Sequence, residues 1–194
     1  MIDKMSNKDD GYYIGEVLNG NTSAFAILVD RHKDMAYNLS YKIVHNSEDA
    51  EEITQDAFVK AYRSLARFKG DARFSTWLYR IVYNSSISHI RKKQREIPVD
   101  NKSVDMLKYS GLTDEQDPKD DELLAVALRM AVDSLPVQEK TMITLYYYQN
   151  TSIEEIAQIM SLSGSNVKVR LFRTRKKLYE HIRSRMKSEV STNL

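Results

Sequence analysis

The sequence predicts an all-α protein in which a flexible acidic linker joins two small helical domains. Apolar residues recur at helical spacing along most of the 194-residue chain, and patterns typical of β-strands are nearly absent. Periodicity is weak from residue 97 to 119, where Pro98, Gly111 and Pro118 interrupt the chain. A structureless loop of that length would be unusual inside one compact domain. The chain exceeds the ~100–150 residues of a usual single domain, a length that allows one domain or two small ones, so the linker decides for two.

Each domain is expected to contain four helices. The N-terminal domain (residues 10–96) should have helices near residues 10–18, 22–45, 47–66 and 74–93. After the linker (97–119), the C-terminal domain (120–187) should have helices near residues 120–134, 137–149, 151–160 and 164–186.

An acidic ridge marks the helix expected at residues 47–66. Asp49, Glu52 and Asp56 stand at i, i+3 and i+7, so they lie along one face of a helix. The ridge flanks an apolar stripe that would face the core, formed by Ala50, Ile53, Ala57 and Ala61. The commonest explanation of such a ridge is a solvated helix face. The alternative with a function is a surface that docks on another protein.

The helix expected at residues 74–93 combines cations, an aromatic ring and a carboxamide on one flank. This flank consists of Arg73, Trp77, Arg80, Asn84 and Arg91. Such side chains suit a single nucleic-acid strand, through phosphate pairing, base stacking and hydrogen bonds to base edges. The alternative is that Trp77 belongs to the core, as Tyr79 and Tyr83 would. The expected buried stripe of this helix is Phe74, Leu78, Ile81 and Ser85.

The C-terminal segment predicts a helix-turn-helix. Residues 151–154 (Thr-Ser-Ile-Glu) fit a capping box, and residues 161–164 (Ser-Leu-Ser-Gly) fit a turn. In the second helix, one stripe should face the core: Val167, Leu171, Thr174, Leu178 and Ile182. The opposite face should carry Ser165, Val169, Phe172, Arg173 and Lys176, with Lys168 at its edge.

That outer face favours duplex DNA as a ligand. Phe172 on the solvent side suits contacts with thymine methyl groups and sugars, while its basic neighbours meet phosphates. Nine Lys or Arg residues and one Glu lie between Lys168 and Lys187. The alternative is a plain αα-hairpin whose basic face is merely solvated.

Composition and charge narrow the classes of function. The chain has no cysteine and four scattered histidines, so neither a disulfide framework nor a metal site is expected. The net charge is only +2, but residues 96–122 hold nine acidic residues against three lysines while the C-terminal helix is basic. This asymmetry indicates several partners, or self-association between segments. No apolar run approaches the roughly 18 residues of a membrane span and no signal peptide is evident, so a cytoplasmic protein without membrane insertion is expected.

Three blocks of the sequence resemble the extracytoplasmic function (ECF) group of bacterial sigma factors, in the sigma-70 family and similar to sigma-E. The blocks cover most of the chain, about residues 10–186, in the order of that family. They are residues 25–31 with the helix 49–62, residues 68–71 with 74–84, and residues 134–136 with the helices 153–157 and 167–177.

The resemblance implies a promoter-specificity factor for RNA polymerase, without catalytic residues or a cofactor. A region 2-like domain would dock on the polymerase β′ subunit through Asp49, Glu52, Gln55 and Asp56. Its flank of Arg73, Trp77, Arg80, Asn84 and Arg91 would hold the melted minus-ten strand, with Asn84 at the base pocket. A region 4-like domain would read the duplex minus-thirty-five element through Ser165, Lys168, Val169, Phe172, Arg173 and Lys176.

The resemblance also implies contact with the polymerase β subunit and an anti-sigma factor as a further partner. Val169 departs from the family pattern, which commonly has a small polar residue there, so the base preference at that position is open.

Two other classes of protein remain as alternatives at this point. A dimeric helix-turn-helix repressor or activator would explain the C-terminal domain, but it would leave the acidic ridge and the Trp77 flank without a role. A nucleic-acid enzyme would need metal-binding carboxylates or an activated nucleophile, and the sequence offers neither pattern.

Overall fold

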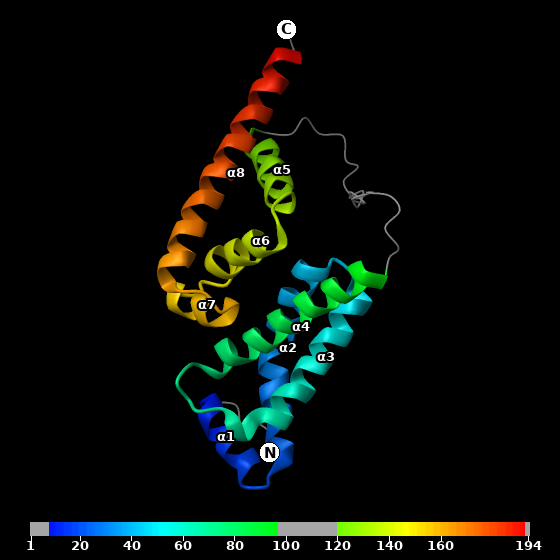
Figure 1. Cartoon of the computed structure of the whole chain (residues 1–194), viewed down its shortest axis with the longest axis vertical. Helices are drawn as coiled ribbons and strands as arrows, with labels where there is room; N and C mark the ends of the chain where they lie inside the picture. The colour runs from blue at the N-terminus through cyan, green and yellow to red at the C-terminus, as the bar shows by residue number, and fades with distance from the viewer. Residues whose placement is uncertain (1–7, 97–119, 193–194) are drawn as a thin grey trace.

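The computed structural model describes residues 8–96 and 120–192, and within these ranges the chain is helical with no β-strand (Figure 1). The all-α prediction is therefore confirmed. The predicted linker, residues 97–119, lies outside the described residues.

The elements follow the predicted order with small changes at their ends. The N-terminal part contains α1 (Asp10–Leu18), η1 (Thr22–Ala24), α2 (Phe25–Val44), α3 (Ser47–Ser64), η2 (Leu65–Arg67) and α4 (Phe74–Glu96). The C-terminal part contains α5 (Asp120–Asp133), α6 (Val137–Ile143), the π-helical turn η3 (Thr144–Tyr148), α7 (Ile153–Met160) and α8 (Gly164–Thr192). The helix expected at 137–149 thus changes to π geometry after Ile143, and α8 is longer than predicted.

In the N-terminal part, α2, α3 and α4 pack around a common apolar core. A two-residue connection, His45 and Asn46, makes α2 and α3 antiparallel neighbours. His45 ends α2 in the left-handed conformation (φ 57°). The Asn46 side chain caps α3 by accepting from the Asp49 backbone N–H at 2.8 Å. The largest fully buried side chains of this part are Tyr13, Leu28, Leu39, Ile43, Leu65, Leu78 and Val82.

The buried stripe of α4 differs from the predicted one. Phe74 and Leu78 are buried as expected, but Val82 and Ser86 continue the stripe, whereas Ile81 and Ser85 are only half-buried. The reason is that α4 is covered from two directions, by α2 and α3 on one side and by α7 on the other. A single helical stripe cannot describe a helix with two buried faces.

The C-terminal part packs α6, α7 and α8 together, while α5 crosses and contacts α8 (Figure 1). Its fully buried side chains are Met142, Leu145, Ile156, Ile159 and Val167. The capping box of α7 is one residue later than predicted: Ser152 caps the Glu155 backbone N–H at 3.2 Å, and the Glu155 carboxylate accepts from the Ser152 N–H at 3.1 Å. Both registers fit the sequence pattern, and the helix starts at Ile153.

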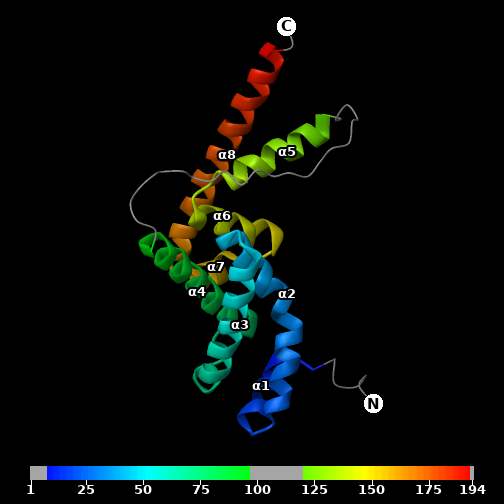
Figure 2. The ribbon, with the colours of Figure 1, turned by 90° about the vertical axis from the view of Figure 1, so that its right-hand side faces the viewer.

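The two parts of the chain also pack against each other. The main contact is between α4 and α7, and a smaller one joins α2 to α6 (Figures 1 and 2).

Candidate nucleic-acid and polymerase interfaces

The outer face of α8 is presented to solvent as the helical wheel predicts. Val167, Leu171, Thr174 and Leu178 are buried against the rest of the domain. The residues on the opposite side are all exposed, with 65% of Phe172 and 47% of Val169 accessible: Ser165, Lys168, Val169, Phe172, Arg173 and Lys176. An exposed phenylalanine among cations has nothing to pack on within the domain, so it is available to a ligand.

The turn before α8 fixes how this face is presented. Ser161 ends α7 in the left-handed conformation (φ 56°), and its backbone N–H bonds to the Ala157 carbonyl. Ser163 then accepts from the Asn166 N–H at 3.2 Å and caps α8. The predicted turn is confirmed, and Ser161 holds its left-handed position.

Two polar contacts to α6 fix the rotation of α8. Lys177 Nζ lies 2.9 Å from Glu139 Oε1, and Arg170 donates to Gln138 Oε1 at 3.0 Å. These two cations are therefore occupied within the domain. Lys168 and Arg173 are exposed on the other side, where a DNA backbone would approach.

The residues of the predicted flank are spread along α4 and the residue before it. Arg73, Arg80, Asn84 and Arg91 are exposed. Trp77 is half-buried, with its ring centroid 5.3 Å from that of Phe68 and 5.8 Å from that of Phe74. It therefore packs on an aromatic cluster and remains partly exposed, and its role toward nucleic acid stays a prediction. Tyr79 and Tyr83 are packing residues, as the alternative had it.

The acidic ridge of α3 divides into two parts. Glu52, Gln55 and Asp56 are exposed, whereas the Asp49 carboxylate is tied to α4. Its Oδ2 atom lies 3.1 Å from Lys93 Nζ and 3.2 Å from His89 Nε2. The hydrogen bond from Lys93 lowers the pKa of Asp49, although some burial opposes this shift. Asp49 thus has a structural partner that spacing along one helix did not reveal.

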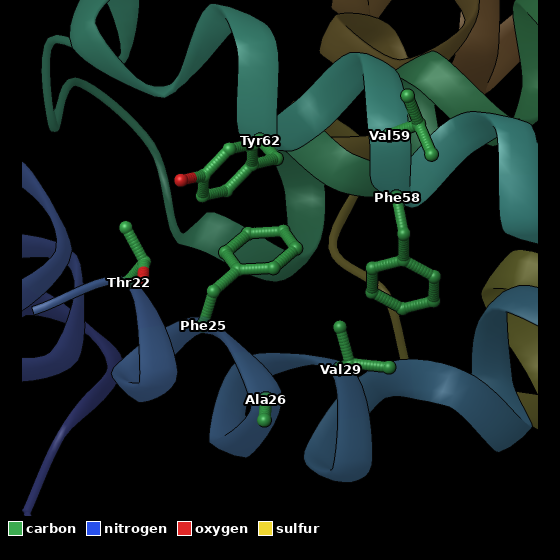
Figure 3. Close-up of a pocket in the computed structure, with 7 residues that line it drawn as sticks. All are labelled: Thr22, Phe25, Ala26, Val29, Phe58, Val59 and Tyr62. Atoms are coloured by element: carbon green, nitrogen blue, oxygen red, sulfur yellow. The ribbon is translucent and has the colours of Figure 1, made fainter.

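Sequence reasoning missed an apolar hollow between α2 and α3, close to the end of α3 (Figure 3). Its volume is about 420 Å³, and Phe25 and Tyr62 meet there edge to face with centroids 5.1 Å apart. The sequence did contain a signal for this hollow, because Phe25 and Val29 on α2 and Phe58 and Tyr62 on α3 are apolar pairs at i, i+4 spacing. The lining residues are Thr22, Phe25, Ala26, Val29, Phe58, Val59 and Tyr62.

Exposed apolar side chains also lie on α5. Four large apolar residues of this helix are between 40% and 44% exposed: Leu124, Val126, Leu128 and Met130. At about 100° per residue, Leu124 and Leu128 share one side of the helix and Val126 and Met130 the opposite side, so they form two pairs.

Within residues 8–96 and 120–192, no group of three or more His, Cys, Asp or Glu side chains is arranged to hold a metal ion. None of the helices described is long and apolar enough to cross a membrane.

One domain contains a helix-turn-helix with an exposed aromatic and cationic face, and the other has a helix with a cationic flank. These features define a two-domain nucleic-acid-binding protein. Comparison with known families gives a closer assignment. Residues 28–96 match the family "Sigma-70 region 2", and residues 125–178 match the family "Sigma-70, region 4".

Curated relatives match over nearly the whole chain. The ECF RNA polymerase sigma factor SigW of Bacillus subtilis is 33% identical over 177 residues, which is 88% of this chain and 95% of SigW. The ECF RNA polymerase sigma-E factor of Escherichia coli K12 is 34% identical over 173 residues, covering 86% of this chain and 90% of sigma-E. The chain therefore belongs to the sigma-70 family of RNA polymerase sigma factors, in the ECF group.

Two solved structures share the fold of this chain. CnrH, solved in complex with the cytosolic domain of CnrY, has a TM-score of 0.64 and 25% identity, over 90% of this chain and 97% of CnrH. The sigma factor RpoE of Bartonella quintana, solved with the anti-sigma factor NepR, shares the fold with a TM-score of 0.60 and 21% identity, over 82% of this chain and 96% of RpoE.

The family settles the class of activity. As an ECF sigma factor, the chain directs RNA polymerase to promoters for transcription initiation, and it is a DNA-binding initiation factor rather than an enzyme. Its partners are core RNA polymerase and promoter DNA.

Proposed function

We propose a specific division of labour among the surfaces of this sigma factor. Residues 10–96 form the polymerase-binding and minus-ten domain, residues 97–119 the linker, and residues 120–187 the minus-thirty-five domain. One observation carries the proposal: the exposed anionic ridge on α3 and the exposed cationic surfaces on α4 and α8 lie on separate helices. A chain that binds a protein and two DNA segments at once needs such separation.

The polymerase contact is assigned to Glu52, Gln55 and Asp56 on α3. These side chains are exposed, so they are able to meet a basic surface of the β′ subunit without breaking any core packing. Asp49 belongs to the same predicted set, but its bonds to Lys93 and His89 give it a supporting role at the start of the ridge.

A contact with the β subunit is assigned to the side of α5 that carries Leu124 and Leu128. Leu124 and Leu128 are one helical turn apart and both exposed. Replacing both with serine should weaken holoenzyme formation while leaving duplex DNA binding unchanged, because α5 lies away from the outer face of α8. Normal assembly of the double variant would remove α5 from the polymerase interface.

The two DNA tasks are assigned to different helices. The outer face of α8 would hold the minus-thirty-five duplex, with Phe172 and Val169 against bases and sugars and Lys168, Arg173 and Lys176 near phosphates. The exposed flank of α4 would receive the melted minus-ten strand, with Asn84 hydrogen-bonding a flipped base and Trp77 offering its ring edge. Unstacking a base costs a few kcal/mol, and pocket contacts and stacking offset this cost.

Separate substitutions test the two DNA tasks. Phe172→Ala and Lys168→Ala should weaken binding of a minus-thirty-five duplex. Asn84→Ala should leave that binding intact and slow promoter melting, followed by permanganate footprinting of the holoenzyme. Tyr179→Ala is the matched control for Phe172→Ala, since it removes an equally exposed ring of α8 outside the assigned set. Normal melting by the Asn84 variant would remove Asn84 from base capture.

An anti-sigma factor is the further partner that we propose. The support is the family membership and the structural neighbour that was solved with the anti-sigma factor NepR. A protein that fills this role must bind the full chain and abolish run-off transcription at equimolar ratio. We also infer that the chain works in the cytoplasm, where bacterial RNA polymerase transcribes the chromosome.

A further inference from the structure

One contact between α2 and α4 uses a sulfur atom as its hydrogen-bond acceptor. The Tyr79 hydroxyl on α4 donates to Met35 Sδ on α2 at 3.0 Å. Tyr79 is only 4% exposed, and no other acceptor among the described residues bonds to its hydroxyl. Burial raises the pKa of Tyr79 to about 12, and the charge of Asp10 adds to the shift, so the hydroxyl keeps its proton at neutral pH. A buried donor thus depends on the thioether of Met35.

The same thioether is accessible to a small oxidant in solution. Met35 is 37% exposed, whereas Tyr79 is buried, so an oxidant is able to approach the thioether from solvent, on the side away from Tyr79. The chain has no cysteine, so the methionine thioethers are its only sulfur groups. Among the methionines whose exposure the structure describes, Met130 is similarly exposed at 44%, while Met142 and Met160 are buried.

Oxidation by a peroxide would convert Met35 to the sulfoxide. A sulfur lone pair forms the new S–O bond with one oxygen of hydrogen peroxide, and the O–O bond breaks. The departing hydroxide takes the proton of the transferred oxygen and leaves as water, so the sulfur is oxidised by two electrons and the peroxide is reduced. The gap between Met35 Sδ and the Tyr79 hydroxyl is already one hydrogen bond long, so the new oxygen has no room there and is added on the solvent side.

The sulfoxide would weaken the packing of α4 on α2. Its sulfur is electron-poor and its oxygen faces solvent, so the buried Tyr79 hydroxyl loses its acceptor. The new group is also polar, at a place where an apolar side chain packed before. Leu78 on one side of Tyr79 is fully buried, and Arg80 on the other side belongs to the proposed minus-ten flank. A change at Tyr79 therefore affects both the core and the proposed DNA-binding side of α4.

We propose that Met35 is a reversible oxidation site, at which a peroxide lowers the stability of the N-terminal domain and with it promoter melting, and at which a methionine sulfoxide reductase restores both. The effect on melting rests on the DNA role proposed above for α4, whereas the effect on stability does not. Because Tyr79 blocks one side of the sulfur, one of the two sulfoxide epimers should predominate. Only one of the two epimer-specific reductases should then reverse the oxidation.

Peroxide treatment of the full chain, followed by removal of the peroxide, tests the site. Peptide mass spectrometry would follow the oxidation of each methionine, and thermal denaturation would give the midpoint temperature. Permanganate footprinting after addition of core polymerase would report promoter melting. Met35→Leu removes the reactive sulfur and keeps a similar volume. Met130→Leu is the matched control, because it removes a similarly exposed methionine outside the surfaces assigned above.

Oxidation should lower the midpoint temperature of wild type and of Met130→Leu by roughly 4–8 °C, because one buried donor loses its acceptor. Promoter melting at a temperature between the two midpoints should fall about threefold, since much of the oxidised chain is unfolded there. One reductase should restore both, and Met35→Leu should show neither change. Oxidation of buried Met142 or Met160 before Met35, an even mixture of epimers, or an unchanged midpoint for oxidised wild type would overturn the site.

Tyr79→Phe separates the lost hydrogen bond from any other effect of oxidation. It removes the hydroxyl that donates to Met35 and keeps the buried ring. Met35 should still be oxidised in this variant, but the fall in midpoint temperature should be less than half that of wild type. An equal fall would overturn the coupling between Met35 and Tyr79. A lowered midpoint with normal melting would overturn the link to transcription, whereas normal melting by Asn84→Ala would count only against the proposed role of Asn84.

Discussion

Charge reversal at Asp56 and at Asp49 should produce two different defects, although both residues belong to one predicted ridge. Asp56 is exposed, so Asp56→Lys should change the free energy of unfolding by no more than ~0.5 kcal/mol. An exposed ion pair at 4 Å contributes about 1 kcal/mol at low salt, and reversal turns this attraction into a similar repulsion. A loss of ~2 kcal/mol corresponds to roughly 30-fold weaker binding to core polymerase.

Asp49→Lys should instead destabilise the N-terminal domain. The Asp49 side chain is 20% exposed and lies 3.1 Å from Lys93 Nζ, so the new lysine would lose this pair and face a like charge. Lys93 is itself largely exposed, and solvent screening limits each of these effects to about 1 kcal/mol. Reversal also places a cation in the first turn of α3, which costs about 0.5 kcal/mol. The free energy of unfolding should fall by roughly 2 kcal/mol.

Urea denaturation and fluorescence anisotropy with labelled sigma factor and core polymerase would separate the two effects. Glu51→Lys is the control, because it makes the same charge change at an exposed position of α3 beside the ridge. The affinities of wild type and variants should converge at high salt, because screening weakens both the wild-type attraction and the variant's repulsion. Asp56→Lys binding as tightly as Glu51→Lys at low salt would refute the assignment of the ridge.

Three further predictions concern the contact between α2 and α6, the cap and the core. Lys140 Nζ lies 3.2 Å from His45 Nε2 where α6 meets α2. Partial burial and the charge of Lys140 lower the pKa of His45 there, while Asp133 opposes this, and Lys42 adds positive charge near Lys140. The packed form thus binds fewer protons than the separated form, so the contact should hold above about pH 6.5 and weaken as pH falls through the lowered pKa. Energy transfer between dyes on the N-terminal and C-terminal parts should show this, and His45→Gln should flatten the profile. Ser152→Ala should lower the free energy of unfolding by ~1 kcal/mol in urea titrations, because Ser152 caps α7. Thr151→Ala should lower it by much less, and the opposite order would contradict the observed capping box. Leu78→Ala, at a fully buried position, should cost about 2–5 kcal/mol in the same assay, and a smaller loss would mean that α4 is not central to the core.

Local patterns predicted well wherever one helix face meets one core. The wheel of α8 separated the buried Val167 and Leu171 from the exposed Val169 and Phe172 because this helix has a single packed side. It failed in part for α4, where a helix distant in sequence covers Thr76 and Tyr83 and so buries a second face. The apolar periodicity of one helix does not show which helix, distant in sequence, will pack against it.

Pairing between distant residues was the other limit of the sequence. The spacing of the acidic residues correctly placed them on one side of α3. Only the fold shows that Asp49 pairs with Lys93, 44 positions later. The hollow beneath Phe25 and Tyr62 likewise depends on how α2 and α3 face each other. The register of the capping box could not be chosen because Thr151 and Ser152 each have a glutamate three residues ahead.

The bonds between α3 and α4 have a mechanical consequence. Asp49 is tied to Lys93 at one end of the pair, and Lys60 donates to Ser85 at 3.1 Å further along. These two contacts hold α3, the helix proposed to bind polymerase, in a fixed position relative to α4, the helix proposed to receive the unpaired base. The protein, rather than the DNA, then sets the distance from the enzyme to the first unpaired base. Such a sigma factor should start transcription over a narrow range of positions, and removing either contact should widen the spread of start sites.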